Sequence, residues 1–547
     1  MFAKLKSERS LPAASGLSGL VLSALFGLIF VMILTPHGFL TGVSSYWQTQ
    51  VEDIGQYQSG FTAYMGAPWS LPLLAIPSLN WPTGTVVTFV DAIPAMAILW
   101  KFLAIVFPMP ENPFGYWLGF CYIMQGVATW YVMRQIRRDD WPKDWFALGL
   151  AVVLCVWMPS LAARMGHLSL QAHFIPLFAL GLYFKTQREN AAQIGRWALL
   201  LLLAFYMNFY LTAMAMAIMF AAGLDLHWRT GQRKALFLHA IPVITIIATV
   251  PLMLGTSFGK AVPDTGFGHY SMNLLSPVAY GNLLKMPFYV SGTDGQYEGY
   301  NYLGLGLIIA IVIAWFIRHG VKKAKRPLAI RPYLVTVMAL LFAYALSNEV
   351  YASNVHLLHW DAPRFLMPVF ETFRSSGRFF WPVSYLLVFF AVAYLVMLPP
   401  ARVVALAVLL LPLQAADLYP TFIAIKAGLM REPNQPADLA AWDRALQGVK
   451  TIHAFPKFKC NGALMREIMP LQVIAANGGY NLTTGFISRY GADCEAIAPE
   501  IAASDPATSA YVFTRAQFTD EQIRSYIPQD AHCRQLDIWI ICRKDPV

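Results

Sequence analysis

Long apolar runs, separated by short polar stretches, dominate the chain from about residue 17 to residue 418. The runs lie at roughly 17–35, 114–133, 146–162, 170–185, 197–208, 211–226, 235–255, 303–318, 332–348, 382–398 and 402–418. A membrane-spanning helix needs about 20 predominantly apolar residues, and most of these runs approach that length. The pattern therefore predicts an α-helical polytopic membrane protein with about eleven spans.

The orientation of the spans follows from the positions of the basic residues. Clusters of Lys and Arg occur at the N-terminus and around 134–143, 185–196, 229–234 and 322–326. Cytoplasmic loops are enriched in these residues. All clusters fall on one side if residues 91–108 form an amphipathic helix at the outer interface rather than a span. We therefore expect an uncleaved first span with a cytoplasmic N-terminus, and outer loops at 36–113, 257–302 and 349–381.

Residues 420–547 lack such apolar runs and are expected to form a second, small α/β domain on the outside, after a transmembrane domain at 1–419. Strands are predicted at "TIHAFP" and "SAYVFTR", and helices at "PADLAAWDRALQGV" and "FTDEQIRSYI", the last with Thr519 as N-cap. This region holds Cys460, Cys494, Cys533 and Cys542, whereas Cys121 and Cys155 lie in apolar runs. An even number of cysteines in an outer domain favours two disulfides in one of three connectivities. Zinc is the rival interpretation, but there is no C-x-x-C pair.

The composition agrees with a membrane protein. Of the 547 residues 57% are hydrophobic and only 13% are charged, whereas a soluble domain has about a quarter charged. Lys and Arg (40) outnumber Asp and Glu (30), but they gather between apolar runs, where they set orientation. Nucleic acid is therefore not an expected partner, and membrane lipids are.

Acidic residues in the first outer loop are the first candidates for chemistry. Glu52 and Asp53 lie in the loop that follows the first span, and Asp91 begins the predicted interfacial helix. A carboxylate held against an apolar wall is well placed to take a proton from a hydroxyl group. We expect Asp53 to be the catalytic base, and Glu52 and Asp91 to contact substrate. Glu52 is the weaker candidate for the base, because neighbouring side chains in an extended loop tend to point apart.

Several charged residues in the other outer loops are candidate substrate-binding groups. Arg374 and Arg378 are four apart and are expected to share a helix face that holds a phosphate, with Arg364 nearby in sequence. Arg164 and His167 fall in a tight outer turn. A metal site made by His167 and His173 is disfavoured by their spacing. Glu298 lies in "SGTDGQYEGYNY", a stretch whose tyrosines and carboxylates suit a sugar.

Several of these stretches carry a family resemblance: "EDIGQYQSGFTAYMGAPWSLP", "RMGHLSLQAHF", "GQYEGYNYLGLGL" and "FRSSGRFFWP". Together with an acid after the first span and interfacial helices before the second, they resemble the GT-C superfamily of membrane glycosyltransferases. More closely, they are similar to a bacterial family of multispanning proteins placed near GT-C by topology. The resemblance implies an inner-membrane enzyme, periplasmic chemistry, a polyprenyl-phosphate sugar donor, and a lipid, polysaccharide or protein acceptor. It makes the first-loop acid, here Asp53, a base or a ligand of a divalent cation (Mg²⁺ or Mn²⁺).

Two other functions, transport and envelope assembly, are alternatives to glycosyl transfer. A transporter or flippase for a lipid-linked envelope glycan is expected to carry charged residues near the middle of its spans and internal repeats. A non-catalytic envelope assembly factor is expected to use the C-terminal domain for docking. The near absence of charge from the apolar runs, and the acids in the outer loops, favour the enzyme.

Overall fold

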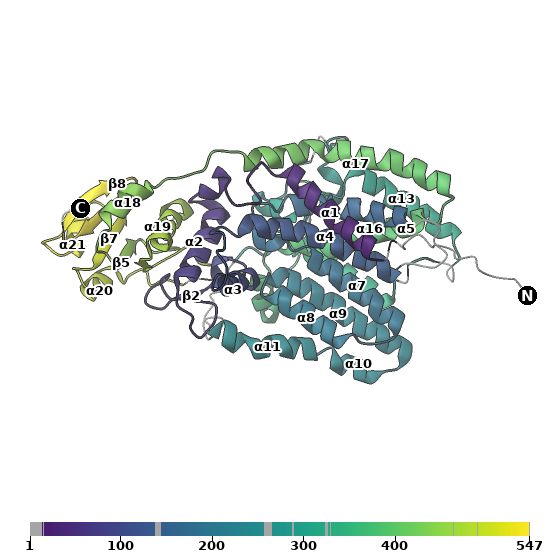
Figure 1. The fold of residues 1–547 in the computed structure, drawn as a ribbon, viewed down its shortest axis with the longest axis horizontal. Coiled ribbons are helices and arrows are strands. Elements are labelled where there is room, and N and C mark those ends of the chain that lie inside the picture. The colour runs from purple at the N-terminus through teal and green to yellow at the C-terminus, as the bar shows by residue number, and fades with distance from the viewer. Residues whose placement is uncertain are drawn as a thin grey trace, which may run out of the picture.

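The structure, a computed structural model, describes residues 14, 16–136, 144–255, 265–286, 289–322, 326–328, 330–462, 464–489 and 491–545. Parts of two predicted basic clusters, at 137–143 and 323–325, lie outside these residues. Figure 1 shows a helical bundle with a small α/β domain (yellow) at one end.

Six helical segments among the described residues are long and apolar enough to cross a membrane. They are α1 (Leu17–Leu34), α5 and α6 (Asp144–Val156 and Pro159–Ala162), α9 (Phe209–Thr230), α10 and α11 (Arg233–Leu238 and Ile241–Met253), η8 and α16 (Ser376–Phe380 and Trp381–Leu395), and α17 (Pro400–Leu429). Large apolar side chains stay exposed on several of them, including Leu22, Ile33, Ile244, Ile247 and Val408. Such faces need a non-aqueous surrounding.

Five further helices complete the bundle and coincide with the other predicted runs. They are α4 (Phe114–Ile136), α7 (Phe174–Glu189), α8 (Ile194–Phe205), α13 (Leu305–Gly320) and α14 (Pro332–Leu346). Every predicted run thus contains a helix, and the count of eleven crossings stays a prediction. Helix α17 runs across the expected domain boundary at 419–420 and ends ten residues later, at Leu429.

The first outer loop folds into short elements that pack on the bundle. They are η1 (Ser45–Gln48), α2 (Glu52–Gly66), β1 (Ala75–Ile76), β2 (Thr85–Val86), η2 (Val87–Val90) and α3 (Pro94–Leu103). Asp53 was expected in an extended segment, but it lies in the first turn of α2. Lys101 on α3 donates hydrogen bonds from Nζ to the carbonyls of Tyr64 (2.7 Å) and Ala67 (2.8 Å), which satisfies the last turn of α2. Helix α3 falls within the range predicted to form the interfacial helix.

The C-terminal domain is a five-stranded mixed sheet with helices. Its elements are α18 (Leu439–Ala445), β5 (Thr451–Phe455), α19 (Met465–Gly478), β6 (Asn481–Leu482), α20 (Ile497–Ala502), β7 (Ser509–Thr514), α21 (Asp520–Tyr526), β8 (His532–Leu536) and β9 (Trp539–Arg543). The strand order is β6-β5-β7-β9-β8, with β5 parallel to β6 and β7, and β9 antiparallel to β7 and β8. Thr519 caps α21 as expected, in a capping box with Gln522.

Two disulfides lie in this domain, Cys460–Cys494 and Cys533–Cys542. They select one of the three connectivities that the sequence leaves open. The second joins directly paired residues of β8 and β9. Cys121 and Cys155 are buried and free. The prediction of two disulfides is confirmed.

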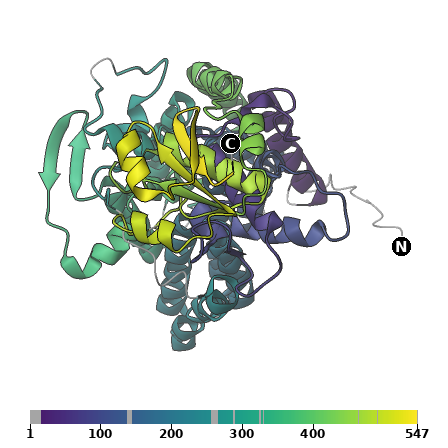
Figure 2. The same cartoon turned by 90° about the vertical axis from the view of Figure 1, so that its left-hand side faces the viewer.

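The α/β domain is fixed to the first outer loop by side-chain hydrogen bonds. Gln472 on α19 donates from Nε2 to Ser59 Oγ on α2 (2.9 Å), and Gln56 on α2 donates from Nε2 to the carbonyl of Phe486 (2.9 Å). Figure 2 looks onto this domain and shows the β3–β4 hairpin (Glu349–Ala352 and Val355–His359) standing apart at the left. The first outer loop therefore lies between the helical bundle and the domain.

Two acids buried in apolar helices satisfy the ends of other helices. Asp225 on α9 accepts hydrogen bonds from the backbone N–H groups of Tyr333 (3.2 Å) and Leu334 (3.1 Å), in the first turn of α14. Asp417 on α17 accepts from the N–H of Leu305 (3.0 Å), the first residue of α13. The N-terminal N–H groups of a helix have no partner within it, and a carboxylate there also complements the helix dipole. Both carboxylates therefore stabilise the ends of neighbouring helices.

We predict that Asp225→Ala and Asp417→Ala each destabilise the protein by about 2–4 kcal/mol, because buried N–H groups lose their acceptors. Asp→Asn at the same positions keeps one acceptor oxygen and should lower the stability less. Thermal unfolding of the purified variants in detergent measures both effects. Alanine variants that melt at the wild-type temperature would contradict the assigned role.

Candidate active site

A cavity of about 640 Å³ opens where the helical bundle, the first outer loop and the C-terminal domain meet. Its walls come from α2, η2, the turn before η3 (Leu168–Gln171), the α8–α9 connection, η5 (Asp294–Gly299), the segment from α15 (Met367–Thr372) to η8, and the C-terminal domain. Six of the nine catalytic and substrate-binding candidates named from the sequence line it: Asp53, Asp91, His167, Glu298, Arg374 and Arg378.

Asp53 and His167 form a close pair on the cavity wall. The imidazole Nδ1 of His167 lies 2.6 Å from Asp53 Oδ2, and about a third of each side chain is exposed. Helix α2 begins with Glu52 and Asp53, so the acid also sits at the positive end of a helix dipole. The pair is a carboxylate that the cavity can reach, held in orientation by an imidazole.

Glu298 links this pair to two arginines. Its Oε2 accepts from Arg164 Nη1 (2.7 Å) and from Arg378 Nε (3.0 Å) and Nη2 (2.9 Å), and its Oε1 lies 3.5 Å from His167 Nε2. Burial by itself raises the pKa of Glu298. The positive charges of Arg378, Arg164 and His167 outweigh burial and lower the pKa to about 2. Glu298 is therefore ionised at neutral pH and fixes both guanidinium groups.

Asp91 is the second acid of the first loop that faces the cavity. Burial and the negative charge of Asp53 raise its pKa to about 6, against the opposing effects of His167 and Arg378. Its backbone is left-handed, with φ of 53°. This conformation turns the chain sharply between η2 and α3. The protonation state of Asp91 thus changes within the physiological range.

Arginines also approach the cavity from two other segments. The guanidinium of Arg374 lies 5.2 Å from the ring centre of Tyr270, and that of Arg378 lies 4.7 Å from the ring centre of Tyr210. Arg489 of the C-terminal domain donates from Nη2 to the carbonyls of Glu371 (2.9 Å) and Thr372 (3.1 Å). One wall of the cavity is therefore rich in cationic groups.

The expected geometry of Arg374 and Arg378 is wrong in one respect. They were expected to share the face of one helix. Arg374 instead lies in the irregular segment between α15 and η8, and Arg378 lies inside η8. The two side chains reach the same cavity because the chain turns there, not because of helical spacing.

Three candidates named from the sequence do not line the cavity. Glu52, at the start of α2 and not in an extended loop, pairs with Arg431. Arg364, in η7 (Arg364–Leu366), is exposed. Arg164 is buried behind the wall, with Glu298 between it and the open space. His173, also from the sequence, is buried with its Nδ1 2.8 Å from the hydroxyl of Tyr385, away from His167.

The donor groups at the cavity do not fit a divalent cation in this arrangement. Asp53 is engaged by His167, and Glu298 by two arginines. In the part of the chain that the structure describes, no group of three or more His, Cys, Asp and Glu side chains is arranged to hold a metal. A hard cation needs several free oxygen ligands. We derive no step through a metal.

Several cavity residues had no signal in the sequence. Tyr57, Asn208 and Tyr210 lie in or beside apolar helices, and Phe486 and Arg489 lie in the C-terminal domain. Tyrosine hydroxyls and amides with apolar bodies suit a sugar, since they combine stacking with hydrogen bonding. Only long-range folding brings these residues to the site.

The fold and site define a helical protein with apolar, span-length helices and a C-terminal α/β domain that lines a charged cavity. The chain belongs to the family described as a domain of unknown function (DUF6311), whose model matches residues 24–419. The model of the DUF6311 C-terminal domain matches residues 441–544. No match was found among curated proteins.

Solved structures similar to the chain include oligosaccharyltransferases of Archaeoglobus fulgidus. The archaeal oligosaccharyltransferase AglB, in complex with an inhibitory peptide and a dolichol-phosphate, has 12% identity and a TM-score of 0.46, over 93% of this chain and 71% of that one. The oligosaccharyltransferase in complex with zinc and sulfate has 12% identity and a TM-score of 0.45, over 90% and 67%. The apo form has 13% identity and a TM-score of 0.44, over 86% and 64%.

We predict that Asp91→Asn stabilises the protein at pH 7.5 by about 1–2 kcal/mol. The folded-state pKa of about 6 exceeds the ordinary value of 3.8. The unfolded chain therefore loses this proton at a lower pH than the folded protein does, and the stability of the wild type falls as the pH rises from 3.8 to about 6. The gain should shrink below pH 6 and vanish near pH 4. Thermal unfolding between pH 4 and 8 measures it.

The matched control is Asp443→Asn, since Asp443 is exposed and no ion pair or hydrogen bond of its side chain is found among the described residues. Its melting curve should follow the wild type at every pH. An Asp91→Asn profile parallel to that of the wild type would show that Asp91 does not titrate near pH 6.

Proposed function

We propose that the protein is a GT-C type glycosyltransferase that moves a sugar, hexosyl or pentosyl, from a polyprenyl-phosphate donor to a lipid, polysaccharide or protein acceptor. Asp53 is the general base in this proposal. The reaction takes place at the periplasmic face of a bacterial inner membrane, and the two disulfides of the C-terminal domain suit that oxidising compartment.

One observation carries the proposal: an accessible carboxylate and a cationic wall face the same cavity. Asp53 lies on the α2 side, and Arg374 and Arg378 lie on the η8 side. Transfer of a sugar from a lipid phosphate needs both groups. One must take the proton of the acceptor hydroxyl, and the other must stabilise the phosphate that leaves.

The proton moves to Asp53 as the acceptor oxygen forms its bond to the anomeric carbon. His167 holds Oδ2 of Asp53 through its Nδ1. No hydrogen bond to Oδ1 is found among the described residues, so this oxygen is the candidate proton acceptor. His167 is therefore a positioning residue, and its other nitrogen is oriented by Glu298.

The bond between the anomeric carbon and the phosphate oxygen breaks in the same displacement, and its electron pair leaves with the polyprenyl phosphate. Attack from the face opposite to the phosphate inverts the anomeric centre. Arg378 is fixed by Glu298 and Tyr210 before substrate arrives. A preorganised cation costs no reorganisation when charge develops on the leaving group.

The alternatives of a flippase and of an assembly factor are less well supported. Asp225 and Asp417 are the buried acids of the span-length helices, and each is used by the end of another helix. The C-terminal domain lines the cavity itself, through Met465, Phe486, Ser488 and Arg489. A domain that only docked a partner would not need to close this space.

We predict that Asp53→Asn lowers glycosyl transfer by a factor of about 10² to 10⁴, the usual contribution of a general base. Mass spectrometry of envelope glycans, in cells that carry the wild-type or the variant gene in place of the native one, measures the product. The matched control is Glu52→Gln. It changes the adjacent carboxylate, which pairs with Arg431 outside the cavity, and should leave transfer intact. Wild-type product from Asp53→Asn would remove Asp53 from the mechanism.

We also predict that Arg378→Ala weakens the use of donor most strongly at low donor concentration, by roughly tenfold or more, because a charge-assisted contact to the phosphate is lost. The dependence of the initial rate on donor concentration separates KM from kcat. An effect confined to kcat would argue that Arg378 does not bind the ground-state donor.

A further inference from the structure

The C-terminal domain forms one wall of the cavity with the segment Thr484–Arg489. Phe486, Ser488 and Arg489 of this segment all line the open space. The segment follows β6 and crosses toward the first outer loop, where the N–H of Ser488 donates to the carbonyl of Phe89 at 2.7 Å. It therefore belongs to the candidate active site as well as to the α/β domain.

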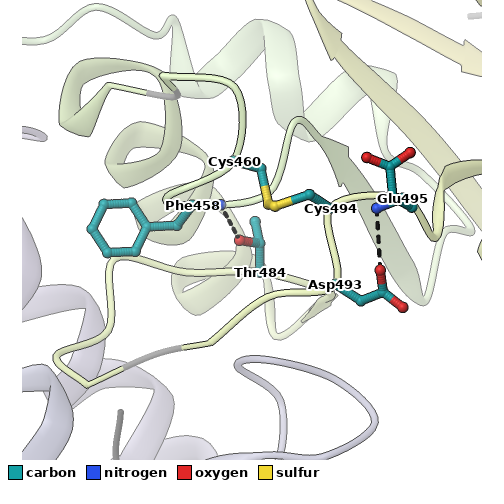
Figure 3. Close-up of a disulfide and its surroundings, with 6 residues drawn as sticks. All are labelled: Phe458, Cys460, Thr484, Asp493, Cys494 and Glu495. Carbon is teal, nitrogen blue, oxygen red and sulfur yellow. Dashed lines mark hydrogen bonds between the residues drawn. A yellow bond between two sulfur atoms is a disulfide. The ribbon is translucent and has the colours of Figure 1, made fainter. Parts of the chain in front are cut away.

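The segment is attached to its own domain at both ends. The N–H of Phe458 donates to Thr484 Oγ1 (2.9 Å), and the disulfide Cys460–Cys494 holds the chain a few residues beyond Arg489. Figure 3 shows that both attachments fall on the same short stretch, Phe458–Cys460. The ring centres of Phe458 and Phe486 lie 4.7 Å apart, so the two side chains pack together. The position of Arg489 is thus fixed by the fold of the domain.

Arg489 itself has an unusual backbone. Its φ is 61°, in the left-handed region that a non-glycine residue adopts only at a cost. The surrounding hydrogen bonds and the disulfide hold it there. The conformation places a guanidinium against the carbonyls of Glu371 and Thr372, which lie three and two residues before Arg374.

The charge of Arg489 is not offset in the way that the neighbouring charges are. Arg164 and Arg378 share the carboxylate of Glu298. The hydrogen bonds of Arg489 within the described part of the chain go only from Nη2 to two neutral carbonyls. Its Nη1 and Nε have no acceptor among those residues. A guanidinium with donors to spare, on the wall of a cavity, suits a phosphate.

We infer that Arg489 is a phosphate-binding residue, through which the C-terminal domain holds the phosphate of the lipid-linked donor. This inference rests on the proposed function for the identity of the donor. The phosphate then lies between two parts of the chain, with Arg374 and Arg378 on the helical side and Arg489 on the side of the α/β domain. The C-terminal domain is part of the donor site.

The test is the binding of a polyprenyl monophosphate to the purified full-length protein in lipid nanodiscs, with no acceptor present. Arg489→Gln keeps a donor for the carbonyls of Glu371 and Thr372 but removes the charge, and should weaken binding about tenfold or more. Arg489→Lys keeps the charge and should lose less. Wild-type affinity in Arg489→Gln would overturn the inference.

The matched control is Arg515→Gln. Arg515 lies in the same domain, is exposed, pairs with Asp520 and does not line the cavity. It should bind the probe like the wild type. Melting temperatures of all variants are measured alongside, and Arg489→Lys decides the question if Arg489→Gln fails to fold.

Two further probes test whether Arg489 contacts the phosphate group of the lipid. A neutral polyprenol should bind equally well to the wild type and to Arg489→Gln. If Arg489→Gln loses affinity equally for both lipids, Arg489 stabilises the fold and does not bind the phosphate. Inorganic phosphate should compete with the probe in the wild type and much less in Arg489→Gln. Equal competition in both would place the phosphate elsewhere.

The outcome is separable from that of the proposed function. Asp53→Asn should bind the polyprenyl phosphate normally and fail to transfer the sugar. If Asp53→Asn transfers sugar normally while Arg489→Gln loses phosphate binding, the assignment of the base fails and the phosphate site stands. If Asp53→Asn abolishes transfer while Arg489→Gln binds normally, the base stands and the phosphate site fails.

Discussion

The candidate site depends on one buried carboxylate. Glu298, in η5, joins Arg164 after α6, Arg378 in η8 and His167 before η3, and through His167 it reaches Asp53 on α2. These segments are far apart in sequence. A buried carboxylate is stable only with such partners, and two buried guanidinium groups equally need an anion. Each charge therefore requires the others, and the requirement fixes the outer ends of several helices relative to one another.

The carboxylates discussed above differ in the hydrogen-bond donors that they contact. Asp225 and Asp417 accept backbone N–H groups at helix ends, and Glu298 accepts guanidinium groups. All three are enclosed and have their hydrogen-bonding capacity used inside the fold. Asp53 differs, since it is partly exposed and holds one partner through a single oxygen. A group that must exchange a proton with a substrate needs that accessibility, which is the reason to assign the chemistry to Asp53 and positioning to Glu298.

The sequence could predict the helices and the residues that short outer turns expose, because apolar runs and basic clusters are local signals. It also named Asp53, His167, Arg374 and Arg378 as candidates, and all four line the cavity. It could not pair Glu298 with Arg164, since 134 residues separate them. The sequence also placed Arg374 and Arg378 on one helix face, which is wrong. The i, i+4 spacing implies a continuous helix, whereas the chain turns between α15 and η8. Arg489 had no local signal at all, and its place depends on a disulfide and on contacts with α2 and η2.

The position of the C-terminal domain bears on how a lipid-linked substrate meets the site. The cavity has apolar, span-length helices on one side and a disulfide-bonded domain on the other. In the proposed reaction, the prenyl chain of the donor remains beside the exposed apolar helix faces while its phosphate lies at the arginines. The first outer loop and the segment Thr484–Arg489 also line this cavity. Under the proposed function, we expect these two parts of the chain to select the hydroxyl acceptor.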